Sequence, residues 1–333
     1  MFKRRRLVEE EEEQPVAAPE EQKSAFDVAA LQNKVHKLLK FSTFEPEQRY
    51  WLDTGFPELN NTFGARDKGI PYGKMIELAG EEHAGKTLIS LLLAGMAQKH
   101  GAAVGRIDLE DSRDDQWDRK LGLDPTQIYN IYPRLVVGKA DDDAPKKKGK
   151  KKRVGSGMRL QSAEEIFHEA EIAMEQLSGA GFKKQFWIID SVANIQTEMG
   201  GSGERNMRVS NDRALFLSQT FPKWAALAAN YNATVFLVNQ LRDKPGVMFG
   251  DPTYSPGGRA LRHGCQVRCR IRRGAKGGTI KRNEEIVGLR SIIKNTKNKS
   301  GGGCVQGGTC GFKIKWAKAV AVYDFMPVED LEG

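Results

Sequence analysis

The segment LAGEEHAGKTLIS, residues 78–90, places a glycine-bounded bend between two apolar runs. It contains the pattern G-x-x-x-x-G-K-T, which here ends a strand-like run and opens a helix-like run. In such a bend the backbone N–H groups turn inward on phosphate oxygens, and the helix N-terminus adds partial positive charge. Lys86 can then reach the β- and γ-phosphates, and the Thr87 hydroxyl can hold Mg²⁺. The predicted nucleotide-binding residues of the bend are Gly80, Glu81, Glu82, His83, Ala84, Gly85, Lys86, Thr87 and Leu88.

A second strand-like run supplies the acid that such a site needs. The run QFWIID, residues 185–190, ends in Asp190, whose carboxylate can complete the Mg²⁺ shell together with Thr87. A glycine-containing turn without a ligand would explain the bend, but it would not predict this acid. The two features together predict binding of a nucleoside triphosphate with Mg²⁺.

Two further polar residues end predicted strands. Glu110 ends the run RIDLE, and Gln240 ends the run VFLVNQ. Parallel sheets bind their ligands at the C-terminal ends of the strands. Glu110 can therefore orient an attacking water, and the Gln240 amide can contact the γ-phosphate. The alternative is that each is an ordinary polar residue at a strand end.

The composition narrows the class of protein. The chain has 333 residues and a formal net charge of +9, which indicates a polyanionic partner without naming it. No apolar run approaches the roughly 20 residues that span a bilayer, and no apolar core follows the basic N-terminus as a signal peptide would require. Four cysteines are too few to staple a chain of this length, and their spacing does not favour zinc. We expect reduced thiols and a cytoplasmic protein, in the host cytoplasm if the source is viral.

Strand and helix patterns alternate through the centre of the chain. Strands are expected at 75–80, 103–109, 185–190 and 233–240, and helices at 87–100, 163–177 and 214–230. This alternation predicts an α/β fold with a mostly parallel twisted sheet and helices on both faces. The later strand-like runs at 266–273, 285–295 and 312–323 are expected to be antiparallel strands at the sheet's edge.

Composition shifts divide the rest of the chain. We expect a disordered charged tail at 1–24, an N-terminal helix at 25–45, a core at 46–325 and a short C-terminal tail at 326–333. The core is interrupted at 139–158 by a basic insertion with seven cations between Lys146 and Arg153. That insertion is either a solvated disordered segment or a flexible arm that grips phosphates.

Three segments together resemble the RecA family of homologous recombinases. They are GIPYGKMIELAGEEHAGKT (69–87), IDLEDSRDDQWDRKLGLD (107–124) and NQLRDKPGVMFGDPTYSPGGRAL (239–261), and the resemblance runs from about Trp51 to Tyr323. It implies a RecA-like P-loop ATPase core, and it implies that the N-terminal helix at 25–45 makes the subunit contact by packing on the adjacent subunit; the alternative is that this helix folds back onto its own domain. It also implies that Asn239 and Gln240 read the γ-phosphate, Trp117 stacks on adenine, and Asp114 reaches the adenine amino group. The catalytic residues it implies are Glu110, Lys86, Gln240 and Lys294, the last acting on the ATP of a neighbouring subunit.

The same resemblance implies two DNA-binding loops, at about 195–208 and 242–261. Their composition supports this independently, because they mix glycines, cations and a few apolar side chains. The expected DNA-binding residues are Arg205, Met207, Arg208, Arg242, Val247, Met248, Phe249, Gly257, Gly258 and Arg259. Two disordered surface loops would explain the glycines but not the apolar residues.

The function implied is that of an ATP-dependent recombinase. Such a protein forms helical filaments of itself on single-stranded DNA, pairs that strand with a homologous duplex, and hydrolyses ATP in the presence of DNA. ATP and Mg²⁺ are the cofactors, and single- and double-stranded DNA are partners. Further partners would be a single-strand-binding protein and loading factors, and no membrane is involved. The alternatives are an ATP-gated DNA-coating scaffold without strand exchange and a ring-forming helicase with the same core.

Overall fold

The structure is a computed structural model, and it describes residues 49–137, 158–197, 207–243, 253–274, 278–300, 308–316 and 321–332. All of these lie in the larger of two compact units, Pro46–Gly333. The predictions for the tail at 1–24, the helix at 25–45 and the insertion through residue 157 fall outside the described residues. So do those for Arg205, Val247, Met248 and Phe249.

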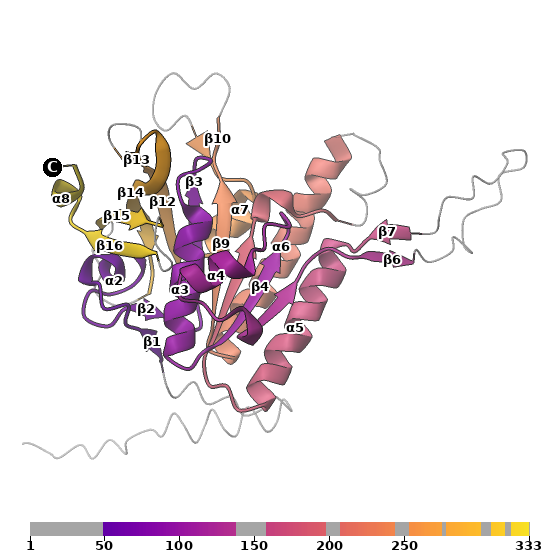
Figure 1. Cartoon of the computed structure of the whole chain (residues 1–333). Helices are drawn as coiled ribbons and strands as arrows, with labels where there is room; N and C mark the ends of the chain where they lie inside the picture. The colour runs from indigo at the N-terminus through magenta and orange to yellow at the C-terminus, as the bar shows by residue number, and fades with distance from the viewer. Residues whose placement is uncertain are drawn as a thin grey trace, which may run out of the picture. The chain divides into compact units, whose positions relative to one another are not determined.

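A large mixed sheet forms the centre of the described chain (Figure 1). Along the sheet the strands follow the order β16, β15, β14, β12, β3, β9, β8, β4, β5, and β13 pairs with β14 off this path. The strands from β12 to β5 run parallel to one another. Their bounds are β3 Met75–Gly80, β4 Ala103–Asp108, β5 Ile128–Ile131, β8 Gln185–Asp190, β9 Ala233–Gln240 and β12 Val267–Arg273.

An antiparallel extension completes the sheet beyond β12. It consists of β13 Thr279–Arg282, β14 Glu285–Asn298, β15 Thr309–Lys315 and β16 Val322–Met326. The sequence pattern predicted antiparallel strands for this whole region, and for β12 that is only half correct. β12 is antiparallel to β14 but parallel to β3, because α7, Gly258–Gly264, brings the chain back to the starting end of the sheet.

Helices cover both faces of the sheet because buried strands present apolar side chains to both sides. On β8, for example, Phe186 and Ile188 belong to one apolar cluster, and Trp187 and Ile189 belong to the other. The first cluster includes residues of α2, Pro57–Phe63, and α3, Lys86–Lys99. The second includes residues of α5, Ala163–Gly179, and α6, Met207–Asn230. The predicted α/β architecture is confirmed.

Shorter elements complete the described chain. They are β1 Trp51–Leu52, β2 Ile70–Pro71, α4 Asp115–Lys120, β6 Leu135–Val137, β7 Met158–Leu160, β10 Arg242–Asp243, β11 Thr253–Tyr254 and α8 Val328–Glu332, with 3₁₀ turns at Pro125–Gln127 and Val192–Asn194. β6 and β7 pair as a ribbon, Leu135 opposite Leu160, that projects beside α5 (Figure 1). Val137 and Met158, the last described residue before the insertion and the first after it, are therefore paired with one another.

Two predicted boundaries were wrong. The first expected DNA-binding loop was placed at 195–208, but α6 begins at Met207, so Met207 and Arg208 are helical. The second was placed at 242–261, but β10, β11 and the first residues of α7 lie within it, so Gly258 and Arg259 are also helical. In both cases the first turn of the helix is rich in polar residues, so the sequence shows no apolar repeat at helical spacing there. Tertiary packing decides where such helices begin.

Candidate active site

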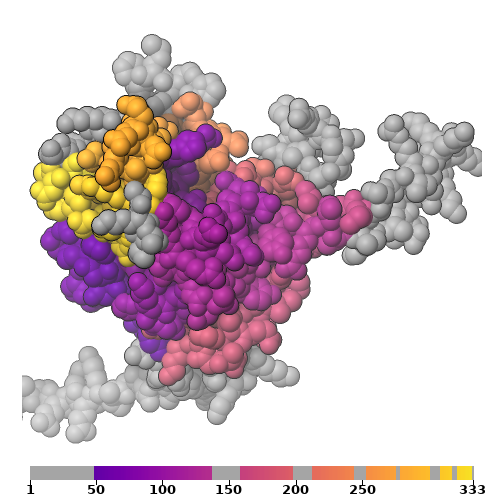
Figure 2. All heavy atoms as spheres, viewed as in Figure 1, coloured from indigo at the N-terminus to yellow at the C-terminus, as the bar shows by residue number. Residues whose placement is uncertain are grey.

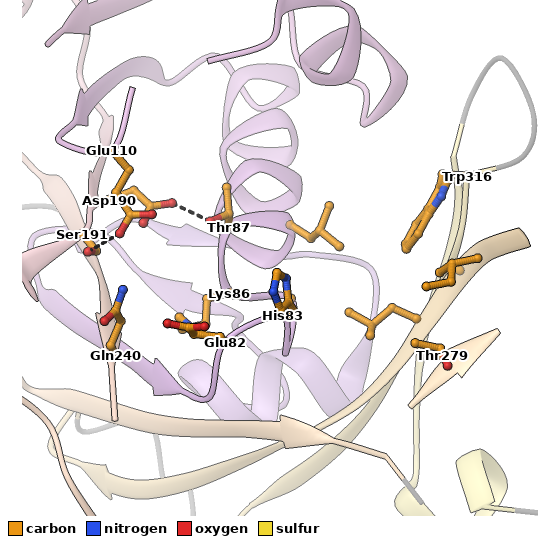
Figure 3. A pocket seen from close by; sticks show the side chains of 15 residues that line it. Glu82, His83, Lys86, Thr87, Glu110, Asp190, Ser191, Gln240, Thr279 and Trp316 are labelled. Atoms are coloured by element: carbon orange, nitrogen blue, oxygen red, sulfur yellow. Dashed lines mark hydrogen bonds between the residues drawn. The ribbon is translucent and has the colours of Figure 1, made fainter. Parts of the chain in front are cut away.

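A cavity of about 560 Å³ lies at the C-terminal ends of β3, β8 and β9 (Figure 3). This volume is typical of small-molecule sites, which are about 300–1,000 Å³. The side chains around it come from the bend after β3, from the neighbouring strand ends, and from the antiparallel extension. They are Glu82, His83, Gly85, Lys86, Thr87, Leu88, Glu110, Asp190, Ser191, Gln240, Thr279, Ile286, Gly288, Leu289 and Trp316.

The bend requires glycine at its end. Gly85 precedes α3 with a left-handed φ of 94°, a region that L-residues with side chains rarely adopt. A Cβ at this position would lie 2.8 Å from Leu289 Cδ2. The antiparallel extension supports the bend from behind, because the Ser291 hydroxyl donates a 2.7 Å hydrogen bond to the Ala84 carbonyl. The bend is therefore held in place by strands that lie far from it in sequence.

Lys86 lies inside this bend. Its ammonium donates to the carbonyls of Gly80 at 3.1 Å and Glu81 at 2.6 Å. Burial lowers the pKa of the Lys86 amine, and the charges of Asp190 and Glu110 oppose that effect. Among the described residues this half-buried ammonium is hydrogen-bonded to carbonyls and makes no salt bridge, so it can form ion pairs with phosphate oxygens without first breaking one.

The side chains of Thr87 and Asp190 point toward one another in the cavity, as Figure 3 shows. The Thr87 hydroxyl donates to Asp190 Oδ2 at 2.6 Å. Burial is the main cause that raises the pKa of Asp190 to about 6; the Thr87 hydrogen bond opposes this shift, and the nearby Glu110 and Asp108 carboxylates add to it. A hydroxyl and a carboxylate on adjacent elements are the oxygen ligands that Mg²⁺ prefers, and a bound cation would favour the ionised carboxylate. This pair fits a magnesium ion.

Glu110 is oriented by residues that follow Asp190. The Ser191 hydroxyl donates to Glu110 Oε1 at 2.6 Å, and the Asn194 amide donates to the same oxygen at 3.0 Å. Asp108 accepts the Glu110 and Ser112 backbone N–H groups at 3.0 and 2.9 Å, which shapes the turn carrying Glu110. Both side-chain donors use one oxygen, so within the described residues the second oxygen is available to a water. Ser191 and Asn194 were not predicted, because their sequence context, DSVAN, has no distinctive spacing.

Gln240 and Asn239 point to opposite sides of β9. Gln240 lines the cavity, whereas Asn239 is fully buried and its amide donates to Glu77 and to the Pro256 carbonyl. The expectation that Asn239 reads the γ-phosphate was therefore wrong. Successive side chains of a strand alternate between its faces, so only one of the two can face the cavity.

The wall of the cavity opposite Lys86 is formed by the antiparallel extension. It carries Thr279, Leu289 and Trp316 (Figure 3). The rings of Trp316 and Trp117 meet edge to face, with centroids 5.8 Å apart and planes at 75°. In the space-filling view the C-terminal strands meet the segment around α3 and α4 on the face toward the viewer (Figure 2). Trp316 was not predicted as a site residue, because a single aromatic residue just after a strand gives no sequence signal.

Asp114 and Trp117 lie beside the main cavity rather than in its lining. Both line a smaller cavity of about 200 Å³ behind the Thr87–Asp190 pair. Asp114 caps α4, since its Oδ1 accepts the backbone N–H groups of Gln116 at 2.9 Å and Trp117 at 3.1 Å. α4 is held to the sheet by a buried pair in which Arg106 donates to both Asp118 oxygens, at 3.1 and 2.9 Å. The cap and the ion pair therefore fix the position of Trp117.

The roots of the two expected loops lie close together. Arg213, on α6, donates to the Ala193 carbonyl at 2.8 Å. Burial lowers the pKa of its guanidinium, and the positive charge of Arg242, at the start of the second loop, lowers it further. Arg213 was not predicted, because it lies in a helix. A half-buried cation whose pKa is lowered by a second positive charge would be stabilised by a nearby anion.

Lys294 lies apart from the cavity lining. It is exposed on β14, opposite Arg270 of β12 and Thr309 of β15. Among the described cysteines, Cys265, Cys269 and Cys310 are buried. Cys265 packs with one apolar cluster, whereas Cys269 and Cys310 pack with the other, so these thiols do not converge on a metal.

Strand, glycine-bounded bend and helix, with the bend's threonine bonded to the acid of a parallel strand, define the P-loop class of nucleotide-binding α/β proteins. The family model for the RecA N-terminal domain matches residues 38–135 and 170–309. The chain belongs to the RecA family. The gap in this match includes β7 and all of β6 except Leu135.

Curated relatives are similar over the same region. Protein RecA of Clostridium botulinum (strain Eklund 17B / Type B) is 34% identical over 248 residues, which cover 74% of this chain and 59% of that protein. Protein RecA of Rhodopirellula baltica is 32% identical, with 74% of this chain and 56% of that protein covered. Protein RecA of Acholeplasma laidlawii is 31% identical over 231 residues, which cover 69% of this chain and 59% of that protein. The match thus spans less than two thirds of each relative.

No helix within the described ranges is both long and apolar enough to cross a membrane.

Proposed function

We propose that this protein is an ATP-dependent DNA recombinase that assembles as a helical filament on single-stranded DNA and promotes pairing and strand exchange with a homologous duplex. The observation that carries the proposal is a single cavity lined by Lys86, Thr87, Glu110, Asp190 and Gln240. β10 begins two residues after Gln240 and pairs with β11, and these two strands form the root of the second loop. Membership of the RecA family supports the same assignment.

Each of the cavity residues would have a separate role in ATP hydrolysis. Lys86 would leave the Gly80 and Glu81 carbonyls and neutralise the β- and γ-phosphates. Thr87 and Asp190 would hold Mg²⁺, which supplies charge stabilisation on the phosphate oxygens. Glu110, held by Ser191 and Asn194, would accept a hydrogen bond from the attacking water and orient it. Trp316 and Trp117 would hold the adenine.

DNA would bind where the two loops leave the core. The positive charge of Arg242 lowers the pKa of Arg213 there, so a phosphate near both side chains would relieve the repulsion of two cations. The predicted residues Met207, Arg208, Gly257, Gly258 and Arg259 lie at the helix starts that follow the two loops. Single strands bind such sites through charge and stacking, without sequence preference.

Assembly would complete each site from the next subunit. Lys294 is exposed and lies outside its own cavity lining, as a cation that acts on a neighbour's ATP would have to be. The helix expected at 25–45 would supply the repeating subunit contact, a heterologous contact that winds rather than closes. A single-strand-binding protein and loading factors would be further partners, and the protein would act in the cytoplasm.

The first experiment is steady-state ATP hydrolysis, with and without single-stranded DNA. Wild type is compared with Lys86→Ala, and Lys99→Ala, at the other end of α3 and exposed, serves as the matched control. We expect DNA to stimulate the wild type and the control, and Lys86→Ala to abolish hydrolysis in both conditions. If DNA changes nothing while Lys86→Ala still abolishes hydrolysis, the nucleotide site stands but the recombinase assignment fails.

Two further measurements distinguish the alternative functions. Strand exchange between a labelled single strand and a homologous duplex separates a recombinase from a DNA-coating scaffold. Electron microscopy of the ATP-bound protein on DNA separates helical filaments from the closed rings of a helicase. Exchange by helical filaments supports the proposal, whereas filaments without exchange would favour the scaffold.

A further inference from the structure

Polar side chains from three neighbouring strands form a ring of contacts. One of them is Asn239, the residue that precedes Gln240. Arg268 of β12 stands directly opposite Glu77 of β3, and Asn239 of β9 lies on the same face two residue pairs further along, opposite Ala79. Glu77 is 1% exposed and Asn239 is 0% exposed. A buried carboxylate is costly unless it is paired, so the partners of Glu77 are essential to this part of the sheet.

Each partner of Glu77 also holds the chain that returns from the second loop. The Asn239 amide donates to Glu77 Oε1 at 2.9 Å and to the Pro256 carbonyl at 2.8 Å. Arg268 donates through Nε to Glu77 Oε2, and through Nη2 to the Ser255 hydroxyl at 2.9 Å. The contacts therefore close a ring through Glu77, Asn239, Pro256, Ser255 and Arg268.

The outgoing end of the same loop is tied to this ring. The Gln240 backbone N–H donates to Asn239 Oδ1 at 3.0 Å. The next residue, Leu241, donates to the carbonyl of Gly80, where the nucleotide bend begins, at 3.3 Å. β10 and β11 then pair the two ends of the loop, with Arg242 opposite Tyr254. A movement of the Gln240 backbone would therefore be felt at residues 255–256 through one amide side chain.

Strand packing alone does not account for a polar ring here. Well-packed apolar residues often stabilise a buried site as well as an ion pair does, or better. A polar ring differs in having directional contacts that can exist in two arrangements, and energetic coupling between sites needs such a two-state element.

We propose that Glu77 and Arg268 are positioning residues that couple the nucleotide state sensed at Gln240 to DNA binding by the second loop. The inference rests on the proposed function and names the part of the chain that carries its regulation. Neither residue contacts the cavity. Both act through Asn239 and through residues 255–256, which fix where the loop returns to the core.

The test measures coupling rather than activity. The affinity for a fluorescent poly-dT oligonucleotide is measured by anisotropy with a slowly hydrolysed ATP analogue and with ADP, and the ratio of the two affinities is the coupling. Glu77→Gln keeps the shape but turns an amide N–H toward a donor, so one contact of the ring is lost. We expect the ratio to fall by about 5- to 150-fold, the usual range of allosteric coupling. Nucleotide affinity and basal hydrolysis should stay within about twofold of wild type, since only groups in the cavity set them.

Two variants keep the test decisive if Glu77→Gln folds poorly. Ser255→Ala removes only the outer contact of Arg268 and leaves no charge unpaired, and we expect a smaller loss of coupling. Combined with Glu77→Gln it should cost no more than Glu77→Gln alone, because both act in one ring. Thr234→Val, which removes a buried 3.1 Å hydrogen bond to the Pro71 carbonyl at the other end of β9, should leave coupling intact.

The outcomes separate this inference from the proposed function. If wild type shows no nucleotide-dependent DNA affinity, the proposed function fails and the ring has nothing to couple. If wild type is coupled and folded Glu77→Gln and Ser255→Ala keep the wild-type ratio, the ring is structural and the inference is overturned. A Thr234→Val variant that loses coupling equally would also overturn it, because general loosening of β9 would then be the cause.

Discussion

Replacing Trp316 with alanine should weaken ATP binding through the base and leave phosphate binding unchanged. Trp316 is on the cavity wall opposite Lys86, with its ring edge to face with Trp117 at 5.8 Å. Stacking of one base on an aromatic side chain contributes about 1–3 kcal/mol, which corresponds to about a 5- to 150-fold loss of affinity. The aromatic pair itself contributes about 0.5–1.5 kcal/mol, so the variant should also unfold at a slightly lower temperature.

Calorimetric titration can isolate the base from the phosphates. ATP and inorganic tripolyphosphate are titrated into wild type, Trp316→Ala, Trp316→Phe and the control Trp51→Ala, which lies outside the cavity lining. We expect Trp316→Ala to lose ATP affinity alone and Trp316→Phe to keep most of it. Equal losses for ATP and tripolyphosphate would refute the stacking role, and so would an unchanged ATP affinity in Trp316→Ala.

Three further predictions concern assembly, pH and the insertion. Lys86→Ala and Lys294→Ala should each be inactive, but a 1:1 mixture of the two variants should recover about a quarter of wild-type hydrolysis. In random heterologous assembly, about a quarter of the sites would combine an intact Lys86 with an intact Lys294 from the neighbouring subunit. No recovery would show that Lys294 acts on the ATP of its own subunit. The Arg159 ion pair, followed by the Ser162 backbone N–H, lowers the pKa of Glu165 to about 2. Urea unfolding should therefore show that wild type is more stable than Glu165→Gln above pH 4.5, by at most about 1 kcal/mol because the ion pair is exposed. This difference in unfolding free energy should disappear as the pH falls toward 2. A difference that grows on acidification would contradict the prediction. Deleting residues 141–155 should weaken duplex DNA capture and lower its salt slope by about one for each cation contact removed; an unchanged slope would rule out the arm.

The strand ends of the cavity could be predicted because they depend on local pattern and on one rule of topology. Asp190 and Gln240 end apolar runs, and parallel strands place such ends at one edge of the sheet. The opposite wall could not be predicted in this way. Trp316 reaches the cavity through the register of β14 and β15, which depends on long-range pairing rather than on residues near Trp316 in sequence. The roles of these residues in binding and hydrolysis stay predictions.

The wrong predictions share one physical cause. At Asn239 a polar residue was read as a ligand contact, although strand alternation turns it away from Gln240 and toward Glu77. At Met207 and Arg259, polar helix starts were read as loops. In each case the identity of a residue was used without the direction in which the backbone points its side chain.

The length of β14 has a mechanical consequence. Ser291 supports the subunit's own nucleotide bend through Ala84, and Lys294 emerges on the opposite face only three residues later. Three residues of extended strand span about 10 Å, and pairing with β12 and β15 on both sides makes that span stiff. In the proposed filament, β14 would rigidly connect the nucleotide bend of one subunit to the ATP bound by the neighbouring subunit. Since a heterologous contact has a direction, β14 would link each bend to the ATP of only one of the two neighbouring subunits.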